Sequence, residues 1–277
     1  MSWGMIGHRE MDSVLSYLLR DEALCVPFTS RIRAGARGCE IYRDVNEDGA
    51  VRECFLFSST GLLLPMLSPL VENRRDLAML LLELRPLVHS IMGVGRSVSG
   101  IEELLPLPPT TRIEYFLMTL APERMLPVMP HATADLRIRR ADPYDADALF
   151  PLQRGYELEE VVISPAHYND AQCMRLLRNA LRDELVFVAE LDGVPVAKAA
   201  TNARGFAVDQ IGGVYTSPEH RGKGFGSIVV EALLRAVFKE KSSACLFVKK
   251  RNRPALAVYE RLGFIPVTDY AISYYGI

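Results

Sequence analysis

The feature that most constrains the fold lies at residues 211–226, where an apolar β-prone run, a proline and a glycine-rich turn follow one another. Residues 227–238 then carry apolar side chains at the spacing of an amphipathic helix. A strand, a glycine-rich turn and a helix in this order leave backbone N–H groups unpaired at the positive end of the helix. Because glycine has no Cβ, an anion can approach the backbone closely. The segment therefore predicts a site for a phosphate or a pyrophosphate.

The positive charge of this segment comes from Arg221 and Lys223, at the rim of the turn. The whole chain carries 32 Lys and Arg against 34 Asp and Glu, which gives a formal net charge of −2. Such a balance provides no general attraction to nucleic acid or to anionic lipid. An anionic ligand must therefore be held by a local site, and we expect neither a nucleic-acid partner nor a membrane partner.

Two common phosphate-binding loops are excluded by their spacing. The GxxxxGK[ST] pattern is absent, and the glycines at 222, 224 and 226 do not follow GxGxxG. A plain structural reading is the alternative, because closely spaced glycines can serve only a tight turn before a helix. The residues that flank the turn decide between the two readings.

These flanks resemble the signatures of a known family. Residues 214–226 resemble the acyl-CoA-binding segment of the GNAT superfamily of N-acyltransferases, written V-x-x-x-P-x-x-[RQ]-G-x-G-x-[GA]. Residues 252–264 resemble the second signature of the same superfamily, N-x-x-A-x-x-x-Y-x-x-x-G-F. The resemblance covers about residues 136–277. It implies an α/β (α+β) fold with a mixed, mostly antiparallel sheet flanked by helices.

The resemblance also assigns residues to the cofactor, acetyl-CoA or another acyl-CoA. Asn252 and Tyr259 lie about two helical turns apart and therefore share one helix face. In the family this face closes over the pantetheine arm, and the tyrosine is the general acid that protonates the departing CoA thiolate. A half-buried tyrosine that packs on the sheet is the alternative for Tyr259. The cofactor-binding residues implied by the resemblance are Val214, Tyr215, Thr216, Arg221, Gly222, Lys223, Gly224, Phe225, Gly226, Ser227, Asn252 and Tyr259.

Acyl transfer also needs a donor to the thioester carbonyl and a base for the amine. The resemblance assigns the donor to a main-chain N–H within residues 214–216. Asp209 lies on the central predicted strand, near the place where relatives have a glutamate base, and is our second catalytic candidate. An exposed charge is the equal alternative, because a one-residue offset moves a side chain to the other face of a strand. The remaining candidates for the base are Glu157, Glu159, Glu160, His167 and His220.

The length of 277 residues suits one large domain or two ordinary ones, and we start from two. Prolines punctuate residues 122–130, so we expect a domain boundary near residues 128–135, with domains at 1–130 and 136–277. The layout of residues 1–130 resembles the degenerate first half of two-domain GNAT proteins, which keeps the fold and loses cofactor binding. We therefore expect two tandem GNAT-like domains. The first one could shape the acceptor site or mediate dimerisation, so a homodimer stays open.

Several local elements follow from periodicity and turn chemistry. Apolar spacing predicts a helix over residues 8–22 and another over 168–182. Turn residues between apolar runs predict hairpins at 39–58 and 184–202. Pro151 is expected to end or bend a helix that begins after Asp142.

The five cysteines form no CxxC pair and no Cys/His cluster at metal-ligand spacing. We therefore expect reduced thiols, a cytoplasmic location and no metal. Residues 1–21 lack the continuous apolar core of a signal peptide. The most apolar stretch, within 61–82, is interrupted by prolines and charges well before the ~20 residues that a membrane helix needs.

The sequence thus predicts an N-acyltransferase that transfers an acetyl group from acetyl-CoA to a primary amine, by direct attack in a ternary complex. A non-catalytic acyl-CoA-binding regulatory or scaffold protein is the alternative. The acceptor is not encoded in any motif, because acceptor specificity lies in loops without a fixed signature.

Overall fold

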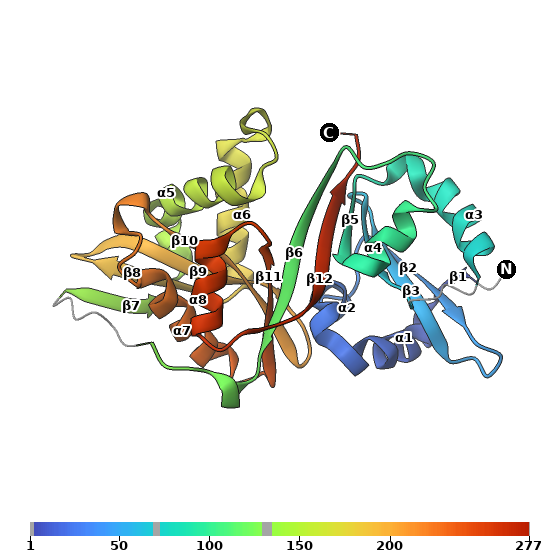
Figure 1. The fold of residues 1–277 in the computed structure, drawn as a ribbon, viewed down its shortest axis with the longest axis horizontal. Helices are drawn as coiled ribbons and strands as arrows, with labels where there is room; N and C mark the ends of the chain where they lie inside the picture. The colour runs from blue at the N-terminus through green and yellow to red at the C-terminus, as the bar shows by residue number, and fades with distance from the viewer. Residues whose placement is uncertain (1–2, 69–72, 129–134, 277) are drawn as a thin grey trace. The chain divides into compact units, whose positions relative to one another are not determined.

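The computed structural model describes residues 3–68, 73–128 and 135–276. Contacts divide the chain into two compact units (Figure 1). Unit 1 consists of Met1–Met118, Phe247–Asn252 and Pro266–Ile277, and unit 2 consists of Thr119–Leu246 and Arg253–Ile265. The expected linker falls partly on residues 129–134, which lie outside the described residues. The assignment of 1–130 and 136–277 as domains stays a prediction.

The sheet of unit 2 has the strand order β11-β10-β9-β8-β7. Neighbouring strands are antiparallel from β7 to β10, whereas β10 and β11 are parallel. The bounds are β7 Leu136–Arg140, β8 Val186–Leu191, β9 Val194–Arg204, β10 Val208–Thr216 and β11 Ser243–Lys249. The predicted hairpin at 184–202 is confirmed as β8 and β9, which meet at a turn with left-handed Asp192 and Gly193.

Helices cover this sheet and enclose its core. α5 contacts β9 and β10 and packs with α6, while α7 contacts β8, β9 and β10. The apolar side chains between α5, α6 and the sheet include Leu149, Leu177 and Val188, all fully buried or nearly so. The helices are α5 Ala146–Tyr156, α6 Asp170–Asp183, α7 Phe225–Val237 and α8 Arg253–Arg261.

Pro151 does not end the helix, because α5 runs through this proline to Tyr156, and a bend at Pro151 stays a prediction. Proline removes the N–H that would bond the carbonyl of Asp147, four residues earlier. Asp147 is exposed, so water can satisfy that carbonyl. The predicted start is confirmed, since Asp142 and Asp145 form a capping box just before the helix.

The sheet of unit 1 has the order β1-β2-β3-β4-β5-β12-β6. The strands β2 and β3 form the predicted hairpin, and the C-terminal strand β12 pairs antiparallel with β5. The strands are β1 Gly4–Met5, β2 Cys39–Val45, β3 Val51–Ser58, β4 Leu62–Met66, β5 Ser90–Val94, β6 Thr111–Leu120 and β12 Ile265–Tyr274. The helices are α1 Met11–Leu18, α2 Val26–Arg33, α3 Arg74–Leu84 and α4 Gly95–Glu102.

The strand β3 shows why unit 1 needs helices on both faces of its sheet. Phe55 and Phe57 belong to the cluster that contains side chains of α3 and α4, whereas Cys54 and Leu56 belong to the cluster that contains α1 and α2. Side chains alternate between the two faces of a strand, so the continuous apolar run at residues 54–57 must be covered on both sides.

The helix predicted over residues 8–22 is shorter than expected. It is α-helical at Met11–Leu18 and continues as a 3₁₀ helix to Leu24, with a non-helical backbone at Asp21. The next helix, α2, was missed by the sequence reading. Its apolar residues Val26 and Phe28 alternate as they would in a strand, and only the proline at its first turn is typical of a helix start.

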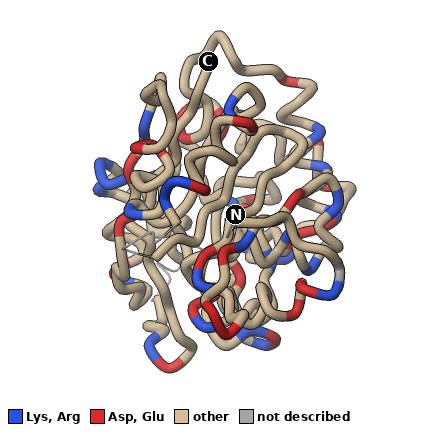
Figure 2. The backbone as a smooth tube through the Cα atoms, turned by 90° about the vertical axis from the view of Figure 1, so that its right-hand side faces the viewer, with Lys and Arg blue, Asp and Glu red and all other residues tan. Residues whose placement is uncertain are grey.

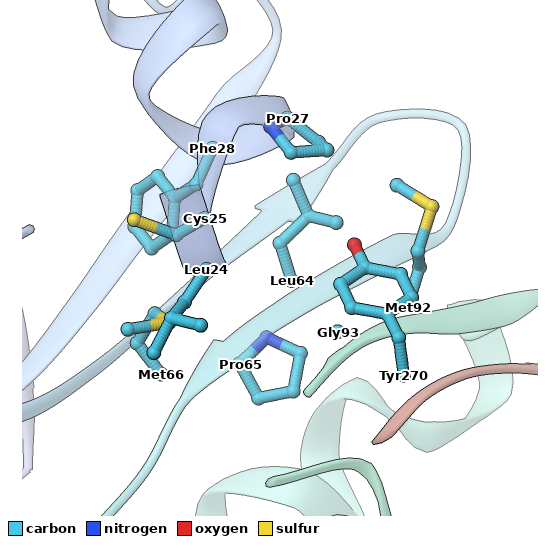
Figure 3. A pocket seen from close by; sticks show the side chains of 10 residues that line it. All are labelled: Leu24, Cys25, Pro27, Phe28, Leu64, Pro65, Met66, Met92, Gly93 and Tyr270. Atoms are coloured by element: carbon cyan, nitrogen blue, oxygen red, sulfur yellow. The ribbon is translucent and has the colours of Figure 1, made fainter. Parts of the chain in front are cut away.

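An apolar hollow of about 180 Å³, which includes space open to solvent, lies in unit 1 (Figure 3). It is lined by α2, β4 and β5 together with Tyr270 of β12. Its lining contains no Asp, Glu, Lys, Arg or His, so we assign no acid–base chemistry to it. Within the described part of the chain, no helix is long and apolar enough to span a bilayer.

Candidate active site

The glycine-rich turn of unit 2 presents its backbone at the start of α7. Gly224 is the N-cap of α7 and has a φ of 84°, and Gly222 has a φ of 76°. Both angles are left-handed, a region that L side chains rarely adopt. A Cβ built on Gly222 would meet nothing within 4 Å. The turn therefore leaves open space beside the backbone at a helix N-terminus, the arrangement that suits a phosphate.

The strand β10 leads into this turn and leaves its parallel partner early. Its pairs with β11 run from Val208 to Gln210, while its pairs with β9 continue to Thr216. From Gly212 to Tyr215 β10 takes three steps, whereas β9 takes two steps from Ala200 to Lys198. The extra residue is a β-bulge at Gly213 and Val214. The bulge lies where the family resemblance puts the main-chain donor to the thioester carbonyl.

At the bulge, the carbonyl oxygen and the N–H of Gly213 both form hydrogen bonds with side chains. The ammonium of Lys198 donates to the carbonyl oxygen of Gly213 at 2.8 Å. The N–H of Gly213 donates to the hydroxyl of Tyr156, at the end of α5. A bulge loses ladder partners, and here Lys198 and Tyr156 replace them.

Lys198 is buried, with 2% of its surface exposed. Burial lowers the pKa of Lys198 to about 8, although the carboxylate of Glu157 opposes this effect. The ammonium also lies 5.0 Å from the centre of the Tyr156 ring, within the range of a cation–π interaction. Burial raises the pKa of Glu157 against the effects of its hydrogen bond from Gln153 and of Lys198. Because its pKa of about 8 lies above 7, Lys198 keeps its charge at neutral pH.

Arg221 of the glycine-rich turn is held by the π-helical segment Glu157–Val161 that follows α5. Its guanidinium donates to both carboxylate oxygens of Glu159, at 2.9 and 2.8 Å, and lies over the ring of Tyr215. The hydroxyl of Tyr215 donates to the same carboxylate at 2.6 Å. Burial raises the pKa of Glu159, but these hydrogen bonds outweigh burial and hold the pKa below its ordinary value. The segment after α5 and the glycine-rich turn are thus joined through one carboxylate.

Tyr259 lies on α8, and 8% of its surface is exposed. Its ring packs edge-on against Phe264, with the ring centres 5.8 Å apart. Burial raises the pKa of Tyr259, and so do nearby Tyr156 and the carboxylate of Glu160. The hydroxyl therefore stays protonated at neutral pH, in the form that can donate a proton.

Asp209 lies near the start of β10 and is fully buried. Its carboxylate forms ion pairs with Arg204 at 3.2 Å and with Lys241 at 3.6 Å. The role of Asp209 as the base stays a prediction, and its two ion pairs are equally those of a carboxylate that stabilises the fold.

The other predicted residues follow the same elements. Lys223 is exposed beside Gly222, whereas Phe225 and Ser227 are buried in the first turn of α7. A Cβ on Gly226 would lie 3.2 Å from the hydroxyl of Thr216, so α7 packs closely on the end of β10. Asn252 directly precedes α8 and belongs to unit 1.

The remaining candidates for the base differ in their positions and in their hydrogen-bond partners. Glu157 and Glu159 are engaged as described, His220 bonds the hydroxyl of Ser217, and His167 ends a 3₁₀ turn before α6. Glu160 is the one whose charge acts on Tyr259. No group of His, Cys, Asp and Glu suited to a metal occurs among residues 3–68, 73–128 and 135–276.

Two residues of this site were missed by the sequence reading. Lys198 stands inside the apolar run of residues 194–201, where a charged side chain is unusual and could have been noticed. Tyr156 had no such signal, because its spacing on α5 is that of an ordinary half-buried residue.

Comparison with known proteins agrees with this geometry. Residues 148–264 match the model of the family described as "Acetyltransferase (GNAT) family". The chain therefore carries a GNAT acetyltransferase domain at these residues, as its two motifs predicted. No curated protein matches the chain.

Three solved structures show how far the fold extends. A GCN5-related N-acetyltransferase from Sphaerobacter thermophilus is 14% identical, with a TM-score of 0.64, over 99% of this chain and 96% of that one. A GCN5-related N-acetyltransferase from Kribbella flavida is 18% identical, with a TM-score of 0.60, over 90% and 96%. A tandem GNAT protein from the clavulanic acid biosynthesis pathway is 14% identical, with a TM-score of 0.59, over 99% and 98%. The likeness bears on the fold and confirms the predicted mixed α/β class with a mostly antiparallel sheet.

Proposed function

We propose that the GNAT domain binds acetyl-CoA and transfers its acetyl group to a primary amine. The observation that carries this proposal is the left-handed, open glycine-rich turn at the start of α7, next to the bulge of β10. The pyrophosphate of CoA would be held by the backbone N–H groups of residues 222–226 and by Arg221 and Lys223.

The bulge of β10 supports direct transfer from the thioester. The N–H of Val214 is the proposed donor to the thioester carbonyl, where negative charge develops when the amine attacks. Tyr259 is the proposed acid that protonates the CoA thiolate as the carbon–sulfur bond breaks. The amine must lose one proton, and Glu160, whose charge acts on Tyr259, is our candidate to accept it.

The nearly even charge of the chain supports a local site for the anionic CoA. Acidic and basic residues are interspersed along the backbone over the face that Figure 2 shows. The cysteines of the described chain are all free, which supports a reducing compartment such as the cytoplasm. Acyl-CoA and an amine are the proposed partners, and a homodimer stays open.

Calorimetry with acetyl-CoA, followed by release of CoA with a panel of amines, tests the proposal. We expect micromolar binding and release of CoA with at least one amine. Arg221→Glu should abolish binding, because it places a negative charge beside the pyrophosphate. Binding without release for any amine would favour the alternative, a non-catalytic acyl-CoA-binding protein. Unchanged affinity in Arg221→Glu would remove the site assignment.

A further inference from the structure

The bulge at Gly213 and Val214 depends on a buried lysine. Lys198 comes from the neighbouring strand β9, and its Cα pairs with that of Tyr215 just beyond the bulge. Its ammonium reaches back to the carbonyl oxygen of Gly213 at 2.8 Å. A buried ammonium is costly unless it is well bonded. A lysine at this position is therefore expected to have a specific use.

The orientation of one peptide group follows from this hydrogen bond. In a trans peptide the C=O of one residue and the N–H of the next point in opposite directions. The carbonyl of Gly213 points at Lys198, so the N–H of Val214 points away from Lys198. Gly213 has a φ of 57°, a left-handed value that glycine adopts without strain.

Burial and charge strengthen the hydrogen bond between the ammonium of Lys198 and the carbonyl of Gly213. Lys198 is surrounded by Tyr156 and Glu157 at the end of α5 and by Cys173 of α6. Hydrogen bonds from charged donors are stronger than neutral ones, and low-dielectric surroundings strengthen them further. The Gly213 N–H is fixed by Tyr156 at the same time, so the peptides on both sides of Gly213 are held by side chains.

We propose that Lys198 is a positioning residue, which fixes the Gly213–Val214 peptide so that the Val214 N–H can donate to the thioester carbonyl. This inference rests on the proposed acetyl transfer. Lys198 does not touch the substrate in this assignment. Lys198 acts through the backbone carbonyl of Gly213, which sets the direction of the Val214 N–H. Its loss should therefore weaken the binding of the thioester carbonyl and leave the binding of the rest of CoA unchanged.

The test compares two ligands that differ in that carbonyl, acetyl-CoA and the thioether S-ethyl-CoA. In the unaltered protein we expect acetyl-CoA to bind about fivefold more tightly, as one net hydrogen bond predicts. In Lys198→Met the preference should fall to about one, while the affinity for S-ethyl-CoA stays the same. A merely structural lysine would weaken both ligands together or neither.

Lys241→Met is the matched control. Lys241 is also buried, and its ammonium donates to the backbone carbonyls of Gly205 at 2.7 Å and Phe206 at 3.0 Å. Its loss should lower the midpoint of thermal unfolding as Lys198→Met does and leave the ligand preference intact. If Lys198→Met does not fold, Lys198→Gln serves in its place. The shorter amide can form hydrogen bonds with the buried polar groups around it, which methionine cannot, and without the charged donor we expect it to reduce the preference as well.

The outcomes separate this inference from the proposed function. If the unaltered protein binds neither ligand, the proposed function fails. If it binds both but without preference, the Val214 donor is wrong, and the role of Lys198 with it. A preference that persists in both Lys198 variants overturns the inference alone. A preference lost in Lys241→Met as well would show a general loss of structure and would also overturn it.

Discussion

The carboxylate of Glu159 accepts two hydrogen bonds from the guanidinium of Arg221, at 2.9 and 2.8 Å. Arg221 belongs to the turn that we assign to the pyrophosphate, and Glu159 follows α5. The ion pair therefore competes with a phosphate for the same cation.

Glu159→Gln should raise the affinity for CoA. Both side chains of the pair are about half exposed, and exposed pairs contribute up to about 1 kcal/mol, so we expect a gain of at most about fivefold in calorimetry. Glu219→Gln is the control, because it removes one exposed negative charge just before Arg221 without touching the contact between Arg221 and Glu159. Equal gains in both variants would mean that net charge alone matters.

Gly222→Ala should weaken acetyl-CoA binding about tenfold or more. The new methyl group would occupy the open space at the turn, where a phosphate would approach the backbone. Gly193→Ala is closely matched, since Gly193 also has a φ of 76° and open space around its Cβ position, but lies in the β8–β9 turn. Both variants should lower the unfolding midpoint similarly. Equal affinities for acetyl-CoA would contradict the phosphate site.

Tyr259→Phe should lower kcat about 10²-fold to 10⁴-fold with an amine that is accepted, as expected for loss of a general acid. The affinity for acetyl-CoA, measured separately, should change little, because the ring still packs on Phe264. Tyr144→Phe, at a nearly fully exposed tyrosine, is the control. An unchanged kcat in Tyr259→Phe would leave this tyrosine a packing role only.

The stability of the protein should depend on Lys198 above neutral pH. The pKa of this lysine is about 8 in the folded chain and about 10.4 in an unfolded one. Between these values the unfolded chain binds more protons at this residue, so its contribution to the unfolding free energy rises with pH. The difference in urea midpoint between the native protein and Lys198→Met should therefore shift in favour of the native protein from pH 7.5 to 9.5. A constant difference would mean that the lysine is not perturbed by burial.

Asp209→Asn separates a structural ion pair from a base. Removing the charge takes away the buried carboxylate that Arg204 and Lys241 share, and we expect a loss of about 3 kcal/mol in urea unfolding. The kcat of the folded variant should stay within about threefold. Asp183→Asn, in an exposed pair with Arg182, should change stability little. A hundredfold loss of kcat in Asp209→Asn would restore its catalytic role.

The sequence predicted most of what periodic apolar spacing and turn chemistry determine. The β2–β3 hairpin, the β8–β9 hairpin and the order of strand, glycine-rich turn and α7 are all present. The sequence did not decide whether the helix ends at Pro151, because the cost of one missing hydrogen bond depends on whether its acceptor can reach water, which a sequence does not state. The helix α2 was missed because a short helix with a buried side has little periodicity to read.

In the candidate site too, local features could be predicted from the sequence and long-range contacts could not. The motifs specify which backbone segments meet, since glycines and a helix start are local features. The contacts of Lys198 with Gly213 and of Glu159 with Arg221 join residues far apart in the chain. Such contacts depend on the register of β9 against β10 and on the length of α5, so side-chain identity alone could not predict them.

The pairing of β12 with β5 sets a limit on dividing this protein into fragments. β12 follows the second GNAT motif in the chain, yet its residues 270–274 pair with β5, a strand from the first hundred residues. A fragment that ends near residue 130 would leave one long edge of β5 without this partner, and a fragment that begins near 136 would carry β12 as a loose, apolar tail. We expect the two fragments to be poorly soluble when produced separately and to recover when they are produced together.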